Sequence, residues 1–175
     1  FRLEFESNQA GIASVSHNVT LTNGAAAELV ITQGAAQLRS GIQVVTQPRL
    51  ALRDLDDNLV PSEASVSATV QGATLSGTTA LEMVDGLATF SDLVLTGTAG
   101  SYTISYAISN PVGLSGLSTS EVVSLTAGAA TKLRVGQQPG DVVAGVGQAV
   151  SVSVQVLDAQ DNLTNVTGPT TINLS

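Results

Sequence analysis

The chain contains no cysteine and no tryptophan, and aromatic residues make up only 3% of its 175 positions. Without cysteine, neither a disulfide framework nor a thiolate metal site can form. Lysine and arginine together number six, against 14 acidic residues, which gives a net charge of −8. Because phosphate backbones are bound by clustered basic side chains, nucleic acid and anionic membrane surfaces are poor partners for this segment.

Catalytic motifs are lacking as well. His17 is the only histidine, so the chain cannot build a Ser-His-Asp relay or a multi-histidine metal site, and we expect His17 on the surface of a strand. Glycine-containing stretches at 72–78, 113–117 and 145–147 each lack a residue that a phosphate-binding loop, a nucleophile elbow or a dinucleotide site requires. We therefore expect that this segment is not an enzyme.

What the chain does have is a strand-forming composition. Hydrophobic residues reach 43%, which argues against disorder. Since aromatic residues are so few, the core must be built mainly from valine, leucine, isoleucine and alanine. Such a composition, with abundant serine and threonine, favours β-strands.

The sequence repeats itself. Residues 24–71 align without a gap with residues 128–175, so that a second copy begins 104 residues after the first. A fixed period indicates one structural module copied in tandem. We expect residues 1–23 to be the C-terminal part of a preceding module, residues 24–127 a complete module, and residues 128–175 the N-terminal part of a following one, with very short Ala/Gly linkers around 23–27 and 127–131.

Apolar and polar residues alternate along several short segments. The pattern is strict at residues 150–156 and again at 102–108, and residues 1–5 resemble the latter segment. Shorter strands are expected near residues 29–32, 66–70, 81–84, 88–90, 93–95 and 122–127. Turn signals separate them at Asp57-Asn58, Gln71-Gly72, Ser76-Gly77, Asp85-Gly86, residues 98–100 and Asn110-Pro111.

Seven or more short strands in a module of about 100 residues predict an all-β fold of tandem immunoglobulin-like β-sandwiches, one complete module flanked by two partial ones. The missing cysteine and tryptophan exclude an antibody-type core. Gly86 and Gly100 are expected to supply the positive φ of tight hairpins, Phe90 to fill the core, and Tyr102 or Tyr106 to make a tyrosine-corner bond.

The order of motifs resembles the bacterial Ig-like repeats that occur in tandem on large surface proteins and share their architecture with invasin and intimin repeats. The residues that carry the resemblance are Ala129, Ala130, Leu133, Val135, Gln138-Pro139, Gly145, Val154, Val156, Asp158, Asn162, Leu75-Ser76-Gly77-Thr78, residues 86–93 and residues 100–104. The chain departs from the family pattern at Asp57 and Asp161, where the family has glycine, and at Gly34-Ala35, which replaces Gln-Pro.

The resemblance implies an extracellular, cell-surface protein that acts as a spacer and display scaffold in a long stalk or filament. Its partners would be neighbouring repeats and, in a filament, other copies of the same protein. Two alternatives stay open, namely an adhesion module that binds a receptor or glycan through its loops, and accessory repeats of a large secreted enzyme.

Asp54, Asp56, Asp57 and Asn58 form the densest group of oxygen ligands in the chain. Clustered carboxylates with an asparagine carbonyl are ligands that Ca²⁺ prefers, so this group is the candidate calcium site, and calcium is the only cofactor that the sequence suggests. The other interpretation is a plain turn, because Asp and Asn bond the local backbone. The second copy keeps only part of the cluster, and the motif lies in mid-module after a core strand.

Four asparagines satisfy the N-glycosylation sequon, at Asn18, Asn162, Asn165 and Asn173. A chain rich in serine and threonine also produces such triplets by chance. We take them as candidate sites if the source organism glycosylates its surface proteins.

Overall fold

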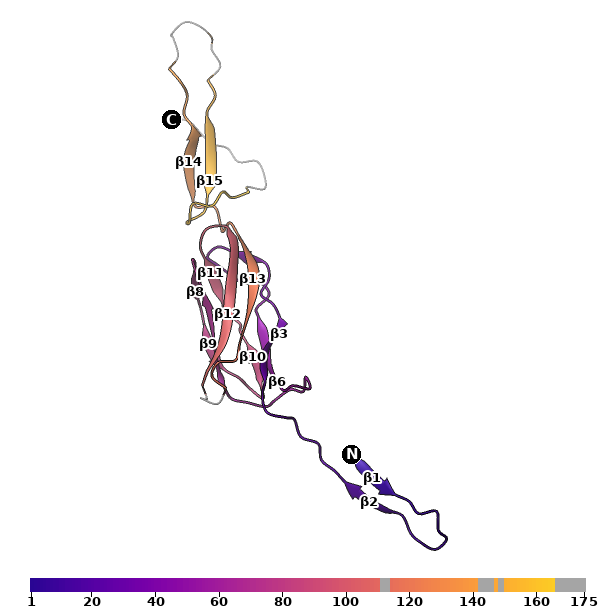
Figure 1. The fold of residues 1–175 in the computed structure, drawn as a ribbon. Helices are drawn as coiled ribbons and strands as arrows, with labels where there is room; N and C mark the ends of the chain where they lie inside the picture. The colour runs from indigo at the N-terminus through magenta and orange to yellow at the C-terminus, as the bar shows by residue number, and fades with distance from the viewer. Residues whose placement is uncertain (111–113, 142–146, 148–149, 166–175) are drawn as a thin grey trace.

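The computed structural model describes residues 1–110, 114–141, 147 and 150–165. Within these residues the chain is built of strands and turns and contains no helix. The described part accordingly has no helix long and apolar enough to span a membrane. Figure 1 shows three parts in succession: a hairpin of β1 and β2, a central body formed by β3 to β13, and a pair formed by β14 and β15.

The central body contains a five-stranded sheet and two three-stranded sheets. The large sheet has the order β4 (Leu38–Arg39), β13 (Ser118–Thr126), β12 (Gly100–Asn110), β7 (Ser65–Val70), β9 (Ala80–Glu82). The smaller sheets have the orders β10 (Leu87–Thr89), β6 (Arg49–Arg53), β3 (Glu28–Gln33) and β5 (Ile42–Gln43), β11 (Val94–Thr96), β8 (Thr74–Ser76). Every pairing is antiparallel except that of β4 with β13. The first segment of the module therefore joins two sheets, since β3 pairs with β6 and β4 with β13.

The inner faces of these sheets share one hydrophobic core. Its members come from all three sheets, including Leu50 and Leu52 of β6, Ile104 of β12 and Leu95 of β11, each at most 1% exposed. All residues of this core lie between Leu29 and Leu125, so residues 24–127 close a core of their own. Burial of this apolar surface is the main force that holds the layers together.

Phe90 fills the core as predicted. It is 1% exposed and its ring centre lies 5.8 Å from that of Tyr106. The Tyr106 hydroxyl donates to Oε1 of Glu121 at 2.7 Å, and the two carboxylate oxygens of Glu121 accept from the backbone N–H of Ala35 at 3.1 and 3.0 Å. Burial and the neighbouring carboxylate raise the pKa of Tyr106, so its hydroxyl stays protonated and keeps donating.

Tyr102, and not Tyr106, makes the bond back to the upstream backbone that the sequence predicted for one of the two. Its hydroxyl donates to the carbonyl oxygen of Thr98 at 2.8 Å. Tyr102 lies near the start of β12, so this bond fixes the loop that leads into the strand. That loop also contacts the turn that follows β15, as described below.

Most expected strands and turns are present. Residues 102–108 fall inside β12, whereas β15 (Ser153–Leu157) begins three residues later than the alternation at 150–156 indicated. Asp85 and Gly86 both have positive φ, 51° and 79°, and form a tight hairpin turn in which Val84 and Leu87 exchange backbone hydrogen bonds. The expectation for Gly100 was wrong: it has no positive φ and begins β12 in register with Leu125.

The N-terminal hairpin repeats the last hairpin of the central body. In β1 (Arg2–Phe5) and β2 (Val15–Asn18), Phe5 pairs with Val15, as Tyr106 pairs with Thr119 in β12 and β13. Counted from this register, Phe1, Leu3 and Phe5 take the places of Tyr102, Ile104 and Tyr106, through a loop that is three residues shorter. The same three side chains are 82%, 49% and 59% exposed, because the described structure provides no sheet opposite them.

Candidate functional site

The repeated Asp-x-x-x-Asn motif forms the same turn twice. One copy follows β6 and the other follows β15. In the first, the Asp54 carboxylate accepts backbone N–H groups of Gly24 at 2.7 Å, Asp56 at 3.0 Å and Asn58 at 2.8 Å. In the second, Asp158 accepts the corresponding N–H groups of Gly128 at 2.7 Å, Gln160 at 2.9 Å and Asn162 at 2.9 Å. Each aspartate therefore binds the start of its module to the turn.

These bonds stabilise the charged carboxylates. The backbone N–H of Gly24 is the main cause that lowers the pKa of Asp54, to about 2, against a smaller opposing effect of burial. Burial raises the pKa of Asp158, but the hydrogen bonds from Asn162 and from the backbone of Gly128, Asn162 and Gln160 outweigh it, and the pKa falls to about 2. Both groups are ionised at neutral pH, as carboxylates that accept several N–H groups usually are.

The turns do not lie in the middle of the module in space, as their place in the sequence suggested. The Asp54 turn packs on Gly24, where the chain enters the central body. The Asp158 turn packs on Gly128 and on loops of the central body. In Figure 1 the β14–β15 pair, of which β14 spans Lys132–Gln137, lies beyond the end of the central body where β12 begins and β13 ends. The junction between the central body and the β14–β15 pair is consequently built by this turn.

Asn162 makes the direct contacts across the junction. Its Oδ1 accepts the backbone N–H of Ala99 at 2.6 Å, and its Nδ2 donates to the carbonyl oxygen of Gly97 at 3.0 Å. The same Nδ2 also donates to Asp158 at 2.8 Å, which fixes the side chain in this orientation. Asn162 is only 7% exposed, so these bonds are formed away from solvent, where an unpaired polar group would be costly.

Ser40 and Arg39 close the junction from the other side. The buried Ser40 hydroxyl lies 2.8 Å from the carbonyl oxygen of Gly97 and 3.2 Å from Oε1 of Gln160. Arg39 donates to the linker carbonyls, through Nε to Ala127 at 3.4 Å and through Nη2 to Gly128 at 3.2 Å. A methyl group on Gly128 would overlap the carbonyl oxygen of Ser40, so only glycine lets the linker approach the central body this closely.

The positions predicted to bind calcium come together in the turn, but the oxygens of Asp54 and one oxygen of Asp57 are already engaged. Both oxygens of Asp54 accept N–H groups, including the Nδ2 of Asn58 at 3.2 and 3.1 Å, and Asp57 pairs with Arg53 at 3.2 Å. The described residues contain no group of three or more histidine, cysteine, aspartate or glutamate side chains that could hold a metal ion. The geometry favours the turn interpretation, and calcium binding stays a prediction.

The candidate glycosylation sites differ in their surroundings. Asn18 and Asn165 are exposed, whereas Asn173 lies outside the described residues. Asn162 is buried and both of its amide atoms are hydrogen-bonded in the junction, so a glycan there would exclude the contacts described above. His17 lies on the exposed strand β2, as expected.

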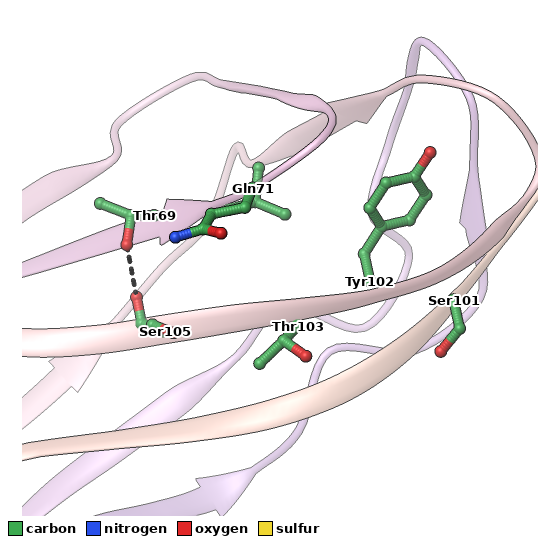
Figure 2. A pocket seen from close by; sticks show the side chains of 7 residues that line it. Thr69, Gln71, Ser101, Tyr102, Thr103 and Ser105 are labelled. Atoms are coloured by element: carbon green, nitrogen blue, oxygen red, sulfur yellow. Dashed lines mark hydrogen bonds between the residues drawn. The ribbon is translucent and has the colours of Figure 1, made fainter.

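A shallow hollow of about 470 Å³ lies along β7 and β12 (Figure 2). Hydroxyl and amide side chains line it around one aromatic ring, from Thr69, Gln71, Ser101, Tyr102, Thr103 and Ser105. None of these residues carries a carboxylate, imidazole or amine. The side chains that line it can donate and accept hydrogen bonds.

Sequence reasoning found the aspartates and asparagines but not what they contact. Ser40, Gly97 and Ala99 carry no motif, and they meet the turn only because two loops far apart in the sequence end at the same edge of the fold. The one usable signal was the repeated Gly-Ala-Ala segment at residues 24 and 128, where the glycine marks the close approach.

No protein-family model and no curated protein matches the chain. The function proposed below is therefore argued from the geometry just described.

Proposed function

We propose that this chain is a structural repeat segment of a long extracellular stalk or filament, in which immunoglobulin-like β-sandwiches follow one another as spacers. The single observation that carries the proposal is the junction between residues 24–127 and the β14–β15 pair. It is formed by direct hydrogen bonds of Asn162 with Gly97 and Ala99. Arg39 also donates hydrogen bonds to two carbonyl oxygens of the linker. A junction of this kind holds successive modules end to end with a defined orientation.

The sandwich assignment is supported by the layering of the central body. One five-stranded sheet and two smaller ones enclose a core that contains Phe90 and Tyr106, and the Tyr102 bond to Thr98 has the form of a tyrosine corner. The N-terminal hairpin repeats the register of β12 and β13, which supports the division of the chain into residues 1–23, 24–127 and 128–175.

The length of each module follows from its longest strand. β12 has 11 residues, which at about 3.3 Å per residue span roughly 36 Å. Antiparallel ladders on both sides of β12 resist extension, and the net charge of −8 keeps neighbouring stalks apart. Extracellular display is the expected setting of such an object.

The test is a length series. Chains with one, two and three copies of residues 24–127 placed ahead of the native C-terminal part would be measured by small-angle X-ray scattering. We expect the maximum dimension to grow by about 35 Å with each added copy, as the rise of β12 indicates. Growth as slow as that of a compact globule would reject the spacer function, and an antibody against this chain that fails to label intact cells would reject surface display.

The hollow of Figure 2 is the observation that favours a second candidate, adhesion through a hydroxyl-rich surface. Side-chain hydroxyls and amides such as those of Thr69, Gln71 and Ser105 would bond sugar hydroxyl groups. A glycan array probed with the full chain tests this function. Binding that is lost in Gln71→Ala would support adhesion. If no glycan on the array binds, adhesion is rejected and the spacer function is the remaining proposal.

A further inference from the structure

The two copies of the Asp-x-x-x-Asn turn have the same interior but differ in exposure. Asp54 and Asp158 are equally buried, at 2% and 1% exposure. Asn162 is 7% exposed because the central body covers it, whereas Asn58, at the same place in the first copy, is exposed. The difference lies outside the turn, since only the second copy has a complete module packed against it.

The hydrogen bonds of the two asparagines show the same difference. Asn162 uses Oδ1 for Ala99 and shares Nδ2 between Gly97 and Asp158. Both bonds of the Asn58 side chain go from Nδ2 to Asp54, and within the described residues its Oδ1 accepts no hydrogen bond. In this part of the chain the Oδ1 acceptor of Asn58 is therefore free, whereas the same atom of Asn162 makes the shortest contact at the existing junction, with the Ala99 N–H.

From this correspondence we infer that the Asp54–Asn58 turn is a docking site for a second copy of the module of residues 24–127. The docked copy contacts it through the loops that contain Ser40 and Gly97 to Ala99. This inference rests on the proposed function as a tandem repeat and names the surface by which one repeat holds the next. The partner is thus recognised through one backbone N–H, one backbone carbonyl and one buried hydroxyl.

The residues around Asn58 fit this partner. Asp56 is the residue of the first copy that corresponds to Gln160 in the second, where Oε1 of Gln160 accepts the Ser40 hydroxyl at 3.2 Å. A carboxylate at this position is an equally good acceptor for that hydroxyl. Leu55, which is 92% exposed, corresponds to Ala159 of the second copy. Ala159 lines a cleft of about 200 Å³ together with Ile42. A leucine side chain at this place extends into that cleft, so the docked copy covers an apolar group that is otherwise in water.

Gly24 provides an independent observation. At Gly128 an added methyl group would overlap the carbonyl oxygen of Ser40 in the adjoining module. At Gly24 the nearest atom to such a methyl group is Oδ2 of Asp54, at 3.3 Å, which a small shift relieves. Neither glycine has a positive φ, so the backbone of the module does not itself require glycine at residue 24. A docked copy does require it.

The test uses a tandem chain in which residues 24–126 are joined to Asn23 of residues 23–175. The first copy carries the Ala99 that meets the Asn58 turn of the second copy, and segmental ¹⁵N labelling makes only the first copy visible by NMR. We expect the amide of this Ala99 to be protected from hydrogen exchange. Asn58→Ala in the second copy should accelerate its exchange about 30-fold, the effect of losing about two hydrogen bonds. Gly24→Ala in the second copy should accelerate it as well, because the added methyl group would overlap the Ser40 carbonyl of the docked copy, as at Gly128.

The 175-residue chain provides the matched control. There Asn58→Ala and Gly24→Ala should leave the exchange of Ala99 unchanged, because that amide is bound by Asn162. An Ala99 amide in the first copy that exchanges equally fast with and without Asn58→Ala would overturn the inference. Scattering from the same tandem separates the two proposals: an extended particle without this protection rejects docking alone, and a compact particle with protection that Asn58→Ala removes rejects the spacer alone.

Discussion

Replacing Asn162 by alanine in the full chain tests the junction directly. The substitution removes the acceptor of the Ala99 N–H, at 2.6 Å, and the donor to the Gly97 carbonyl, at 3.0 Å. It also removes the bond to Asp158 inside the turn. Asn58→Ala is the matched control, since the Asn58 side chain makes the corresponding bonds to Asp54 and, among the described residues, none outside its own turn.

The expected size of the effect follows from this difference. A typical hydrogen bond contributes about 1 kcal/mol net, so the two bonds across the junction contribute about 2 kcal/mol. That free energy corresponds to roughly a 30-fold change in the equilibrium between open and closed junction. The bond within the turn is common to both variants and cancels in the comparison.

Amide hydrogen exchange measured by NMR reports this equilibrium at one atom. Exchange of Ala99 requires the junction to open, so its rate should rise about 30-fold in Asn162→Ala, in proportion to the opening constant, and stay unchanged in Asn58→Ala. Amides of the β12–β7 ladder, such as those around Ala107, should be unaffected in both variants. Equal rates for Ala99 in the native chain and in Asn162→Ala would refute the role assigned to Asn162.

Three further predictions concern acid, the core and the turn. The pKa of Asp158 is about 2 in the folded chain against an ordinary value of 3.8, so protons bind the unfolded chain more strongly, and its contribution is complete above about pH 4 and should be lost as the pH falls toward 2. The measurement is the exchange rate of Ala99 relative to its intrinsic rate at the same pH, which should rise on acidification; a flat profile of this ratio is the contrary result. Phe90→Ala should lower the free energy of unfolding in denaturant by about 3–5 kcal/mol, because Phe90 is buried against Tyr106; a loss below about 1 kcal/mol would contradict the core assignment. Asp57→Gly should raise that free energy by up to about 1 kcal/mol, because Asp57 has φ of 65° and its ion pair with Arg53 is exposed and weak; a marked loss in the same measurement would show that the ion pair dominates.

The fold could be predicted to the extent that alternation and turn chemistry determine it. The strict pattern at residues 102–108 corresponds to a strand with one face in the core, and Asp85-Gly86 gives the hairpin that this pair favours. Short strands such as β4 and β5 were missed, because two residues carry no periodicity. Their place is set by pairing with β13 and β11, which is a tertiary effect.

The candidate site was only half predictable. The aspartates and asparagines were visible because the sequence shows the turn twice, but their position in mid-module suggested the wrong surroundings. Contact order explains the failure: Asn162 meets Gly97 and Ala99 across more than 60 residues, through loops without a motif. The positive φ of Asp57 and Asp161 is a conformation that glycine adopts without strain.

The two polar residues of the turn have separate tasks, and the two copies allow them to be told apart. The aspartate points inward in both copies and accepts N–H groups of its own module, at Gly24 in one and at Gly128 in the other. The asparagine contributes to its own turn through Nδ2, and in the second copy its Oδ1 binds the adjoining module. The aspartate thus binds the turn to the Gly-Ala-Ala segment that precedes it, and in the second copy the asparagine binds the central body. Because Asp158 also orients Asn162 through the shared Nδ2, the bonds that Asp158 makes within its turn also fix the side chain that contacts the central body.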